Sequence, residues 1–327
     1  MGSTHIKALR NIPEAQLIAV VSSDPVKLEG DLSNIQGNIG GPGEKLDFSK
    51  VHKHRTLEEA FRDPEVEGID LCLPTDLHAP AAIAALRAGK HVLVEKPMAL
   101  DEKQSSEMLR AAEQAGRVLM CGQVLRFWPD YMALFDALKE SRLGPVRSGL
   151  FRRRCAAPAW SKWMGNPSKS GGGVFDLLIH DVDFCLYLWG PPRAVTAVGH
   201  EDLENGIDFI TARLEYGNIP AVEITGGWHH RKSYPFSMEY TVQGDAGTLE
   251  YASWGRPPVF YHADGVTETL KLPEKDGFQG ELEYFIQCCR ENRKPEMCPP
   301  EQSAAAVSLL RLMLESRKRK GERIEWR

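Results

Sequence analysis

Three short stretches of this sequence carry reactive side chains that a fold could bring together. Lys96 follows an apolar run and precedes Pro97 in VLVEKP. Asp176 and His180 stand four positions apart in GGGVFDLLIHDVD, so on a helix they share one face. A histidine titrates near neutral pH and, beside a carboxylate, suits the role of a general base. The pattern predicts proton-transfer chemistry, although an ion pair at a loop and a hydrogen bond on a helix surface would also explain these residues.

The third stretch, LCLPTDLH, ends a predicted strand at Pro74 and Thr75 and places His78 in the first turn of the next helix. These residues could line the ribose and nicotinamide of a dinucleotide, or form a turn in which the histidine caps the helix. Asp181 and Asp183 add acidic groups to the second stretch. One histidine with carboxylates on differing helix faces makes a poor closed metal site, so we predict no bound metal.

Strands and helices alternate through the first third of the chain. The predicted strands are 16–23, 68–75, 90–97 and 117–124. The predicted helices between them are 56–63, 77–89 and 100–116. Such alternation indicates βαβ units and a doubly wound parallel sheet with helices on both faces. Ligands of these sheets bind beyond the carboxyl ends of the strands, where Thr75 and Lys96 stand.

The pattern changes after about residue 122. A helix at 129–141 leads to a long strand at 146–156, and an apolar helix covers 174–190. Strand-like runs then follow with only turns between them, which is typical of an antiparallel sheet. They are 194–200, 208–216, 221–228, 237–244 and 247–253, and helices at 281–291 and 300–319 finish the chain. We therefore predict a dinucleotide-binding α/β domain at 1–122 and an α+β domain at 123–327, with helices on one face of an open antiparallel sheet.

Composition excludes several classes of protein. Lys and Arg total 40 against 45 Asp and Glu, a net charge of -5, which does not suit nucleic-acid binding. The two basic runs, Arg152–Arg154 and Arg317–Lys320, are expected to be solvated faces. The seven cysteines show no CxxC spacing and indicate reduced thiols, and no apolar run approaches the roughly 20 residues of a membrane span. We expect a soluble, cytoplasmic protein that acts on a small molecule.

The order and spacing of many motifs resemble the glucose–fructose oxidoreductase / inositol dehydrogenase (Gfo/Idh/MocA) family of NAD(P)-dependent oxidoreductases. The motifs are AQLIAVVSSDP, LPTDLH, GKHVLVEKPMAL, GQVLRFWPDY, WMGNPSKSGGG, DLLIHDVD, VQGDAGTLEY, ELEYFIQCCREN and ESRKRKGERIEW, and they cover nearly the whole chain. The resemblance implies a Rossmann domain and an open-faced antiparallel sheet domain, in agreement with the pattern above. It also implies a last helix that packs back toward the N-terminal domain.

The resemblance implies a hydride transfer between a secondary alcohol of a sugar, polyol or cyclitol and NAD or NADP. His180 would take the hydroxyl proton, Lys96 would stabilise the developing alkoxide, and Asp176 would hold the substrate or the histidine. The residues implied around the cofactor are Gly2, Ser22, Ser23, Leu73, Pro74, Thr75, His78, Glu95, Lys96, Gln123 and Trp163. The residues implied around the substrate are Lys96, Arg126, Trp160, Asn166, Asp176 and His180. Hinge packing would explain Trp163 equally well.

The sequence departs from the family pattern at its beginning. MGSTHIKAL matches the helix that follows the GxGxxG turn, with only the last glycine, Gly2. The two other glycines permit a tight turn and close approach of the pyrophosphate. The first strand would lie centrally in the sheet, where its loss leaves unpaired backbone groups. We therefore expect the natural protein to have this strand and loop upstream of the sequence given.

A second departure concerns the choice of cofactor. The second strand of NAD-dependent members commonly ends in an acid that binds the ribose hydroxyls, and Ser22 and Ser23 stand there. Without that acid a 2′-phosphate is not repelled, and Lys27 could substitute for the missing arginine, so we lean slightly toward NADP. The alternatives are an NAD-dependent glycosidase of the same fold and a non-catalytic dinucleotide-binding protein. By analogy with the family we expect a homodimer or homotetramer through the antiparallel sheet.

Overall fold

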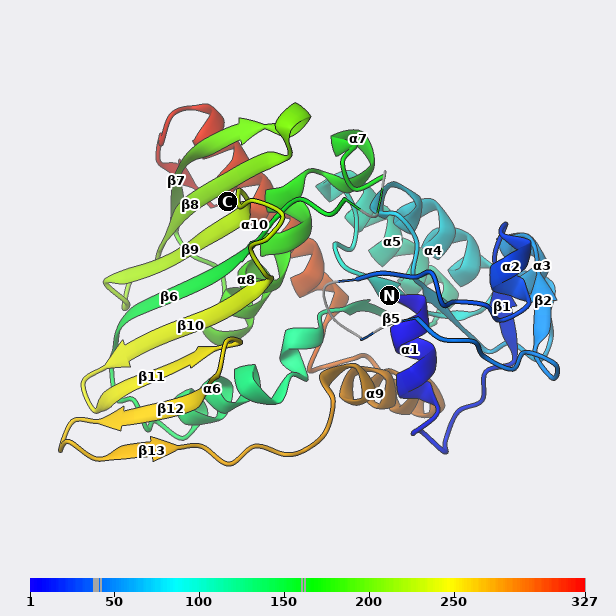
Figure 1. The fold of residues 1–327 in the computed structure, drawn as a ribbon, viewed down its shortest axis with the longest axis horizontal. Helices are drawn as coiled ribbons and strands as arrows, with labels where there is room; N and C mark the ends of the chain where they lie inside the picture. The colour runs from blue at the N-terminus through cyan, green and yellow to red at the C-terminus, as the bar shows by residue number, and fades with distance from the viewer. Residues whose placement is uncertain (38–40, 42, 160, 162, 327) are drawn as a thin grey trace.

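The computed structural model describes residues 1–37, 41, 43–159, 161 and 163–326. Figure 1 shows two parts, a large tilted sheet backed by helices and a smaller α/β part that contains the N-terminus. The α/β part confirms the predicted alternation of strands and helices. Its elements are α1 (Gly2–Leu9), β1 (Ala19–Val21), α2 (Pro25–Leu28), β2 (His52–His54), α3 (Leu57–Arg62), β3 (Gly68–Leu71), η1 (Thr75–Leu77), α4 (His78–Arg87), β4 (His91–Glu95), α5 (Glu102–Ala115) and β5 (Leu119–Gly122).

Local sequence signals explain where these helices begin and end. Thr56 and Glu59 form a reciprocal capping box at the start of α3. The Asp101 side chain accepts a hydrogen bond from the backbone of Gln104 and caps α5. The same helix ends at Gly116, whose φ of 60° is the left-handed conformation that glycine adopts without strain. These caps set the helix boundaries and with them the ends of the strands that carry the site.

The parallel strands form two sheets. One contains β1 and β2, and the other has the order β3-β4-β5. All five residues of β4 are buried, as expected for a strand covered on both faces. In contrast, β1 is only partly buried although its sequence is apolar and β-branched, and Val21 is 37% exposed. The two sheets stand on either side of α1 in Figure 1.

The second part is built on a nine-stranded sheet. Its strands follow the order β13-β12-β11-β10-β6-β9-β8-β7-β14. Their bounds are β6 (Val146–Cys155), β7 (Ala194–Asp202), β8 (Ile207–Glu215), β9 (Ala221–Trp228), β10 (Ser237–Gly244), β11 (Gly247–Ala252), β12 (Arg256–His262), β13 (Thr267–Thr269) and β14 (Ile324–Glu325). The expected antiparallel pattern holds except between β6 and β9, which run parallel. The exception arises because β6 lies between β9 and β10, which are antiparallel to each other, so β6 must run parallel to one of them.

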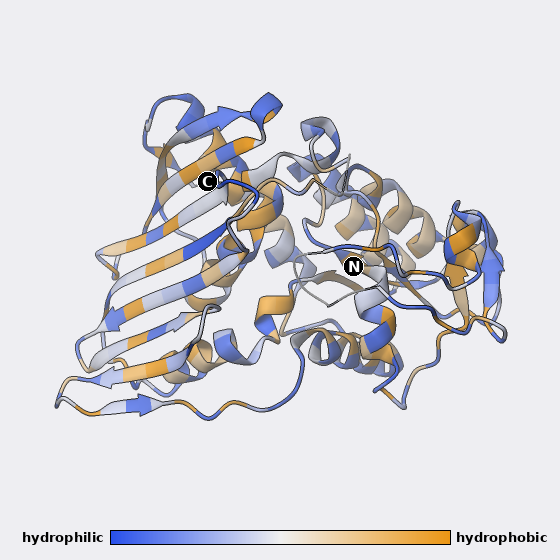
Figure 2. Cartoon of the chain, in the orientation of Figure 1, coloured by the Kyte–Doolittle hydropathy of each residue, from blue (hydrophilic) through white to orange (hydrophobic). Residues whose placement is uncertain are grey.

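Helices cover one face of this sheet. The elements outside the sheet are η2 (Val124–Arg126), α6 (Pro129–Lys139), α7 (Pro167–Ser170), α8 (Gly173–Trp189), η3 (Leu203–Asn205), α9 (Gly277–Glu291) and α10 (Pro300–Lys318). Figure 1 shows α8 and α10 behind the sheet, and nearly all side chains of α8 are buried. Hydrophilic and hydrophobic residues are interspersed along the strands of this sheet in Figure 2.

The basic run in β6 is not simply a solvated face, which corrects that expectation. Side chains alternate across a strand, so Arg153 points inward and is only 2% exposed, whereas its neighbours Arg152 and Arg154 pair with Glu239 on the other face. The same prediction for the second basic run is wrong at its first residue. Arg317 forms ion pairs with Glu201 and Asp208. An inward arginine needs a buried acid, and the sequence does not show which one it meets.

The two last helices connect the parts. The last helix, α10, packs against α8 and β7 and also against α5, and Arg311 donates a hydrogen bond to the carbonyl of Leu100. Before it, α9 packs against α1, and Phe278, Leu282 and Phe285 join a core cluster with the N-terminal sheet.

All seven cysteines are unpaired. Among the described helices, none combines the length and apolarity required to cross a membrane.

Candidate active site

Lys96 and Asp176 meet where β4 ends. The Lys96 Nζ donates hydrogen bonds to the Asp176 carbonyl oxygen at 2.9 Å and to its Oδ1 at 3.1 Å. Lys96 directly follows β4 and the first turn of α8 provides the carboxylate, so the contact joins the two parts of the chain. Both side chains are largely buried but not sealed, at 15% and 10% exposure. The predicted lysine and aspartate therefore share one site.

His180 lies one helical turn beyond Asp176 on α8, at the same cavity. Its Nδ1 is buried and, among the described residues, has no hydrogen-bond partner. Removal from solvent, followed by the positive charges of Lys96 and Arg153, holds the pKa of His180 well below its ordinary value. The imidazole is therefore neutral at physiological pH and able to accept a proton. The Asp176 carboxylate contacts the lysine instead of orienting this ring.

The start of α8 is fixed by its surroundings. A side chain at Gly173 would overlap the Trp228 indole, so only glycine allows this close approach. The backbone N–H of Val174 donates to the Asp208 carboxylate at 2.8 Å, and Arg317 pairs with the same carboxylate at 2.6 Å. These contacts, from β8 and α10, fix the position of the first turn of α8. They thereby fix the position of Asp176, which lies in that turn.

Two buried ion pairs hold α8 further along its length. Arg153 of β6 binds Asp181, and Arg126 of η2 binds Asp183 through two nitrogens at 2.7 and 2.8 Å. The two carboxylates considered as metal ligands are therefore paired with guanidinium groups. Arg126, predicted at the substrate, is fully buried and also donates to the Met297 carbonyl and the Gln302 side chain. The structure places Arg126 in the interior, not in the described cavity wall.

A cavity of about 1800 Å³ runs from β1 and α1 to the Lys96 site. The predicted residues that line it are Gly2, Ser22, Ser23, Leu73, Pro74, Glu95, Lys96, Trp163, Asp176 and His180. The predicted residues outside its described lining are Thr75, His78, Gln123, Arg126 and Asn166. Trp160 lies outside the described residues. The cavity thus connects the end of β1, where an adenosine ribose would lie, to the lysine and histidine.

Two of the predicted residues outside the lining, His78 and Asn166, have structural contacts through their side chains. Both His78 nitrogens lie 2.8 Å from backbone carbonyls, those of Pro97 and Leu73, so this ring ties the end of β3 to the turn after Lys96. The Asn166 side chain accepts from Ser168 N–H and caps α7. The Gln123 amide is buried, and neither of its polar atoms has a partner in the described structure. Of these, His78 positions the site most directly.

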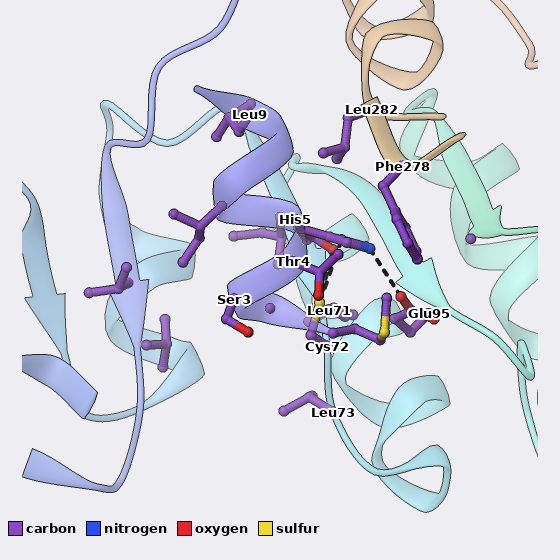
Figure 3. A pocket seen from close by; sticks show the side chains of 18 of the residues that line it. Ser3, Thr4, His5, Leu9, Leu71, Cys72, Leu73, Glu95, Phe278 and Leu282 are labelled. Carbon is purple, nitrogen blue, oxygen red and sulfur yellow. Dashed lines mark hydrogen bonds and ion pairs between the residues drawn. The ribbon is translucent and has the colours of Figure 1, made fainter. Parts of the chain in front are cut away.

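His5 was not singled out from the sequence, yet it connects α1 to the site (Figure 3). Its Nδ1 lies 2.8 Å from Asp70 Oδ2, and its Nε2 lies 3.1 Å from Glu95 Oε1. Glu95 also accepts from the backbone N–H of Lys96 at 3.0 Å. Burial alone would raise the pKa of Glu95, but the hydrogen bond and charge of His5 outweigh it and lower that pKa to about 2. No sequence signal connects His5 with Glu95, because the two residues stand 90 positions apart.

The donor set fits a dinucleotide. Parallel strands end at one wall of the cavity, α1 begins there with Gly2, and the neutral imidazole and the lysine stand at the far end. Helix N-termini and strand ends of this kind bind phosphates and ribose in doubly wound folds. No carboxylate side chain follows β1 directly, because Ser22 and Ser23 occupy that position. The fold and the cavity define a dinucleotide-binding α/β protein with a second, sheet-based domain.

Comparisons with known proteins agree with this class. Residues 1–123 match the model of the oxidoreductase family with an NAD-binding Rossmann fold, and residues 131–250 match the Gfo/Idh/MocA C-terminal domain. The chain belongs to the Gfo/Idh/MocA family. It is an oxidoreductase whose N-terminal domain binds NAD or NADP, as the resemblance implied.

Individual relatives cover most of the chain. A scyllo-inositol 2-dehydrogenase (NADP(+)) of Bacillus subtilis is 27% identical over 304 residues, 84% of each chain. An inositol 2-dehydrogenase of Rhizobium meliloti is 26% identical over 302 residues, 88% of this chain and 84% of the relative. The solved structure of levoglucosan dehydrogenase with NADH and levoglucosan has a TM-score of 0.83 at 17% identity, covering 99% of this chain and 96% of that one. This last likeness supports the fold.

Proposed function

We propose that this protein transfers a hydride between a secondary alcohol of a sugar, polyol or cyclitol and NAD(P). The observation that carries the proposal is the convergence of Lys96, Asp176 and the neutral His180 at the cavity of about 1800 Å³. A cation, a carboxylate and a proton acceptor at one place are what alcohol oxidation requires. The family assignment supports the same reaction class.

Each of the three residues has a distinct part in this reaction. His180 accepts the proton of the substrate hydroxyl, because its depressed pKa keeps the ring neutral. Lys96 places its charge beside the oxygen that becomes negative, since its ammonium already lies on a carboxylate at the cavity wall. Asp176 holds Lys96 in place and offers its second oxygen to a substrate hydroxyl. A bound nicotinamide supplies the hydride acceptor in oxidation and the donor in reduction.

We propose a cyclitol or hexose as the substrate class. The B. subtilis and R. meliloti relatives act on inositols, as their names state, and they match across most of the chain. The site offers charged and polar groups, Trp163 lines the same cavity, and such groups suit a hydroxylated ring. We also propose a preference for NADP, because Ser22 and Ser23 directly follow β1, and the next residue, Asp24, uses its carboxylate to cap α2 by accepting from Val26 N–H.

The proposal is tested by turnover and binding. Purified protein would be assayed with myo-inositol, scyllo-inositol and glucose, each with NAD and NADP. His180→Ala is expected to lower kcat by about 100- to 10,000-fold. Its matched control is His200→Ala, because His200 is an exposed histidine of β7 outside the described cavity lining. Wild-type turnover in His180→Ala would remove this residue from the mechanism, and Ser22→Asp should shift the preference from NADP toward NAD.

A further inference from the structure

Two histidines and an aspartate come together between β2 and α3. His52 and His54 are the first and last residues of β2, and Asp63 directly follows α3. Side chains alternate along a strand, so the two histidines share one face of β2. Lys53, between them, belongs to the other face and pairs with Glu29. Figure 1 shows β2 beside α3, at the end of the molecule away from the nine-stranded sheet.

Both imidazole rings contact the same carboxylate oxygen. His52 Nδ1 lies 2.7 Å from Asp63 Oδ2, and His54 Nε2 lies 3.1 Å from it. The three side chains offer ligand atoms that all lie within 4.8 Å of one another. Around a tetrahedral zinc ion with bonds of about 2.0–2.1 Å, neighbouring ligand atoms are about 3.3 Å apart. Small movements of the two rings would therefore let one ion replace the protons of these hydrogen bonds.

The surroundings of the three residues also resemble those of a metal site. The Oδ1 of Asp63 accepts from the backbone N–H of Glu65 at 3.0 Å, which holds the carboxylate and leaves its Oδ2 to the histidines. The Glu65 carboxylate lies 3.7 Å from the other ring nitrogen of His52, Nε2. A histidine that binds a metal through one nitrogen usually donates its other N–H to a carboxylate, and metal-bound carboxylates are themselves hydrogen-bonded. Both supporting groups are in place here.

The cluster is accessible from solvent on one side. The Asp63 side chain is 6% exposed, whereas those of His54 and His52 are 19% and 47% exposed. An ion can therefore reach the ligand atoms, and water can complete the coordination. None of the three residues is among the described lining of the cavity at Lys96. They are also separate from the acids of α8, at which no bound metal was predicted.

We propose that His52, His54 and Asp63 form a binding site for one zinc ion. The ion is bound by Nδ1, Nε2 and Oδ2 of the three side chains in that order, and Glu65 orients the first ring. Two imidazoles and one carboxylate suit zinc, whereas calcium and magnesium prefer oxygen ligands throughout. The bound ion links the end of α3 to β2 and so stabilises the β1–β2 pair at the edge of the molecule.

The test is a calorimetric titration of the full chain with zinc chloride after treatment with a chelator. The variants are His52→Gln and His54→Gln, because a glutamine amide can still donate a hydrogen bond to Asp63 but is a poor ligand for zinc. One control is His200→Gln, which changes an exposed histidine of β7. The second control is Cys72→Ser, because His5, Cys72 and Glu95 form the other close group of metal-ligand types among the described residues.

The wild type is expected to bind zinc, and each glutamine variant is expected to bind it about 100-fold or more weakly. Both controls should keep the wild-type affinity. Cobalt(II), used in place of zinc, should show no thiolate-to-metal charge-transfer absorption. The proposal is overturned if the wild type binds no zinc, if the glutamine variants keep its affinity, or if Cys72→Ser alone loses binding. No nicotinamide cofactor or sugar is present, so none of these results depends on the proposed reaction.

Discussion

Arg126 and Asp183 form a two-nitrogen ion pair at 2.7 and 2.8 Å in which both side chains are essentially free of solvent. The arginine follows the last strand of the N-terminal sheet and the aspartate stands on the helix that carries Asp176 and His180. Gln302 of α10 binds the same guanidinium. One buried charge pair therefore couples the dinucleotide-binding part to the helix of the candidate site.

Removing one partner of this pair should be strongly destabilising. Arg126→Met leaves Asp183 as an unpaired buried carboxylate, and the expected loss is about 3–5 kcal/mol of unfolding free energy. The matched control is Arg147→Met, because Arg147 and Asp245 form a half-exposed pair that solvent screens and that should contribute little to stability. Urea unfolding of the two variants measures the difference. Equal losses of unfolding free energy in the two variants would show that burial does not increase the contribution of the Arg126–Asp183 pair to stability.

The Asp208 carboxylate should position the start of α8. Asp208→Asn keeps an acceptor for Val174 N–H but weakens the pair with Arg317, so α8 can shift. We expect kcat to fall about tenfold, a change of about 1.4 kcal/mol, while the fold persists. Glu201→Gln is the control, because Glu201 binds the same arginine at a half-exposed place and does not touch α8. If both variants keep the wild-type kcat, the contact of Asp208 with the start of α8 has no part in positioning the site.

Stability should depend on Glu95 at acidic pH. Its pKa is about 2 in the folded protein, below the ordinary value of 4.5, because of His5. A depressed pKa means that the stabilisation is complete above pH 4.5 and is lost as the pH falls from 4.5 toward 2. The shift corresponds to about 3 kcal/mol. Glu95→Gln should lower stability at pH 7 and flatten the acid limb measured by urea unfolding at a series of pH values.

The exposed Glu29 provides the reference for this pH dependence. It forms an ion pair with Lys53 at 72% exposure, so Glu29→Gln should leave the acid limb of the wild type unchanged. If Glu95→Gln loses unfolding free energy below pH 4.5 as steeply as the wild type does, the acid loss of stability comes from other carboxylates.

The pH profile of turnover should reflect the lysine beside the histidine. His180 has a lowered pKa, so the acid limb of kcat/KM should lie below pH 6.5. Lys96→Met removes one of the positive charges that lower this pKa, and the acid limb should move upward while kcat falls. The measurement is kcat/KM from pH 4.5 to 8. An unmoved limb with a lower kcat would show that Lys96 does not tune the base.

Most of the architecture follows from local pattern. The alternation of apolar runs with capped helices predicts the βαβ units, since Thr56, Asp101 and Gly116 act through neighbouring backbone. The spacing of Asp176 and His180 places them on one helix face, because helix geometry depends on sequence distance alone. The ends of strands predict where Lys96 lies. These are short-range properties, and the structure confirms them.

The partners of the buried charges could not be predicted in the same way. No local feature of the sequence indicates that Arg153 faces Asp181 or that Arg126 pairs with Asp183, because each pair joins residues far apart in the chain. The same holds for His5 and Glu95 and for the contact of Lys96 with Asp176.

The sequence by itself determined most of the elements, their order and the reactive residue types, although the short elements α2, β2, β13 and β14 and the strand β12 were not predicted. The tertiary structure decided which charges pair, which predicted residues reach the cavity, and that the β1–β2 pair stands apart from β3-β4-β5. The physical reason is that periodicity and capping act over a few residues, whereas burial and pairing depend on which distant surfaces meet.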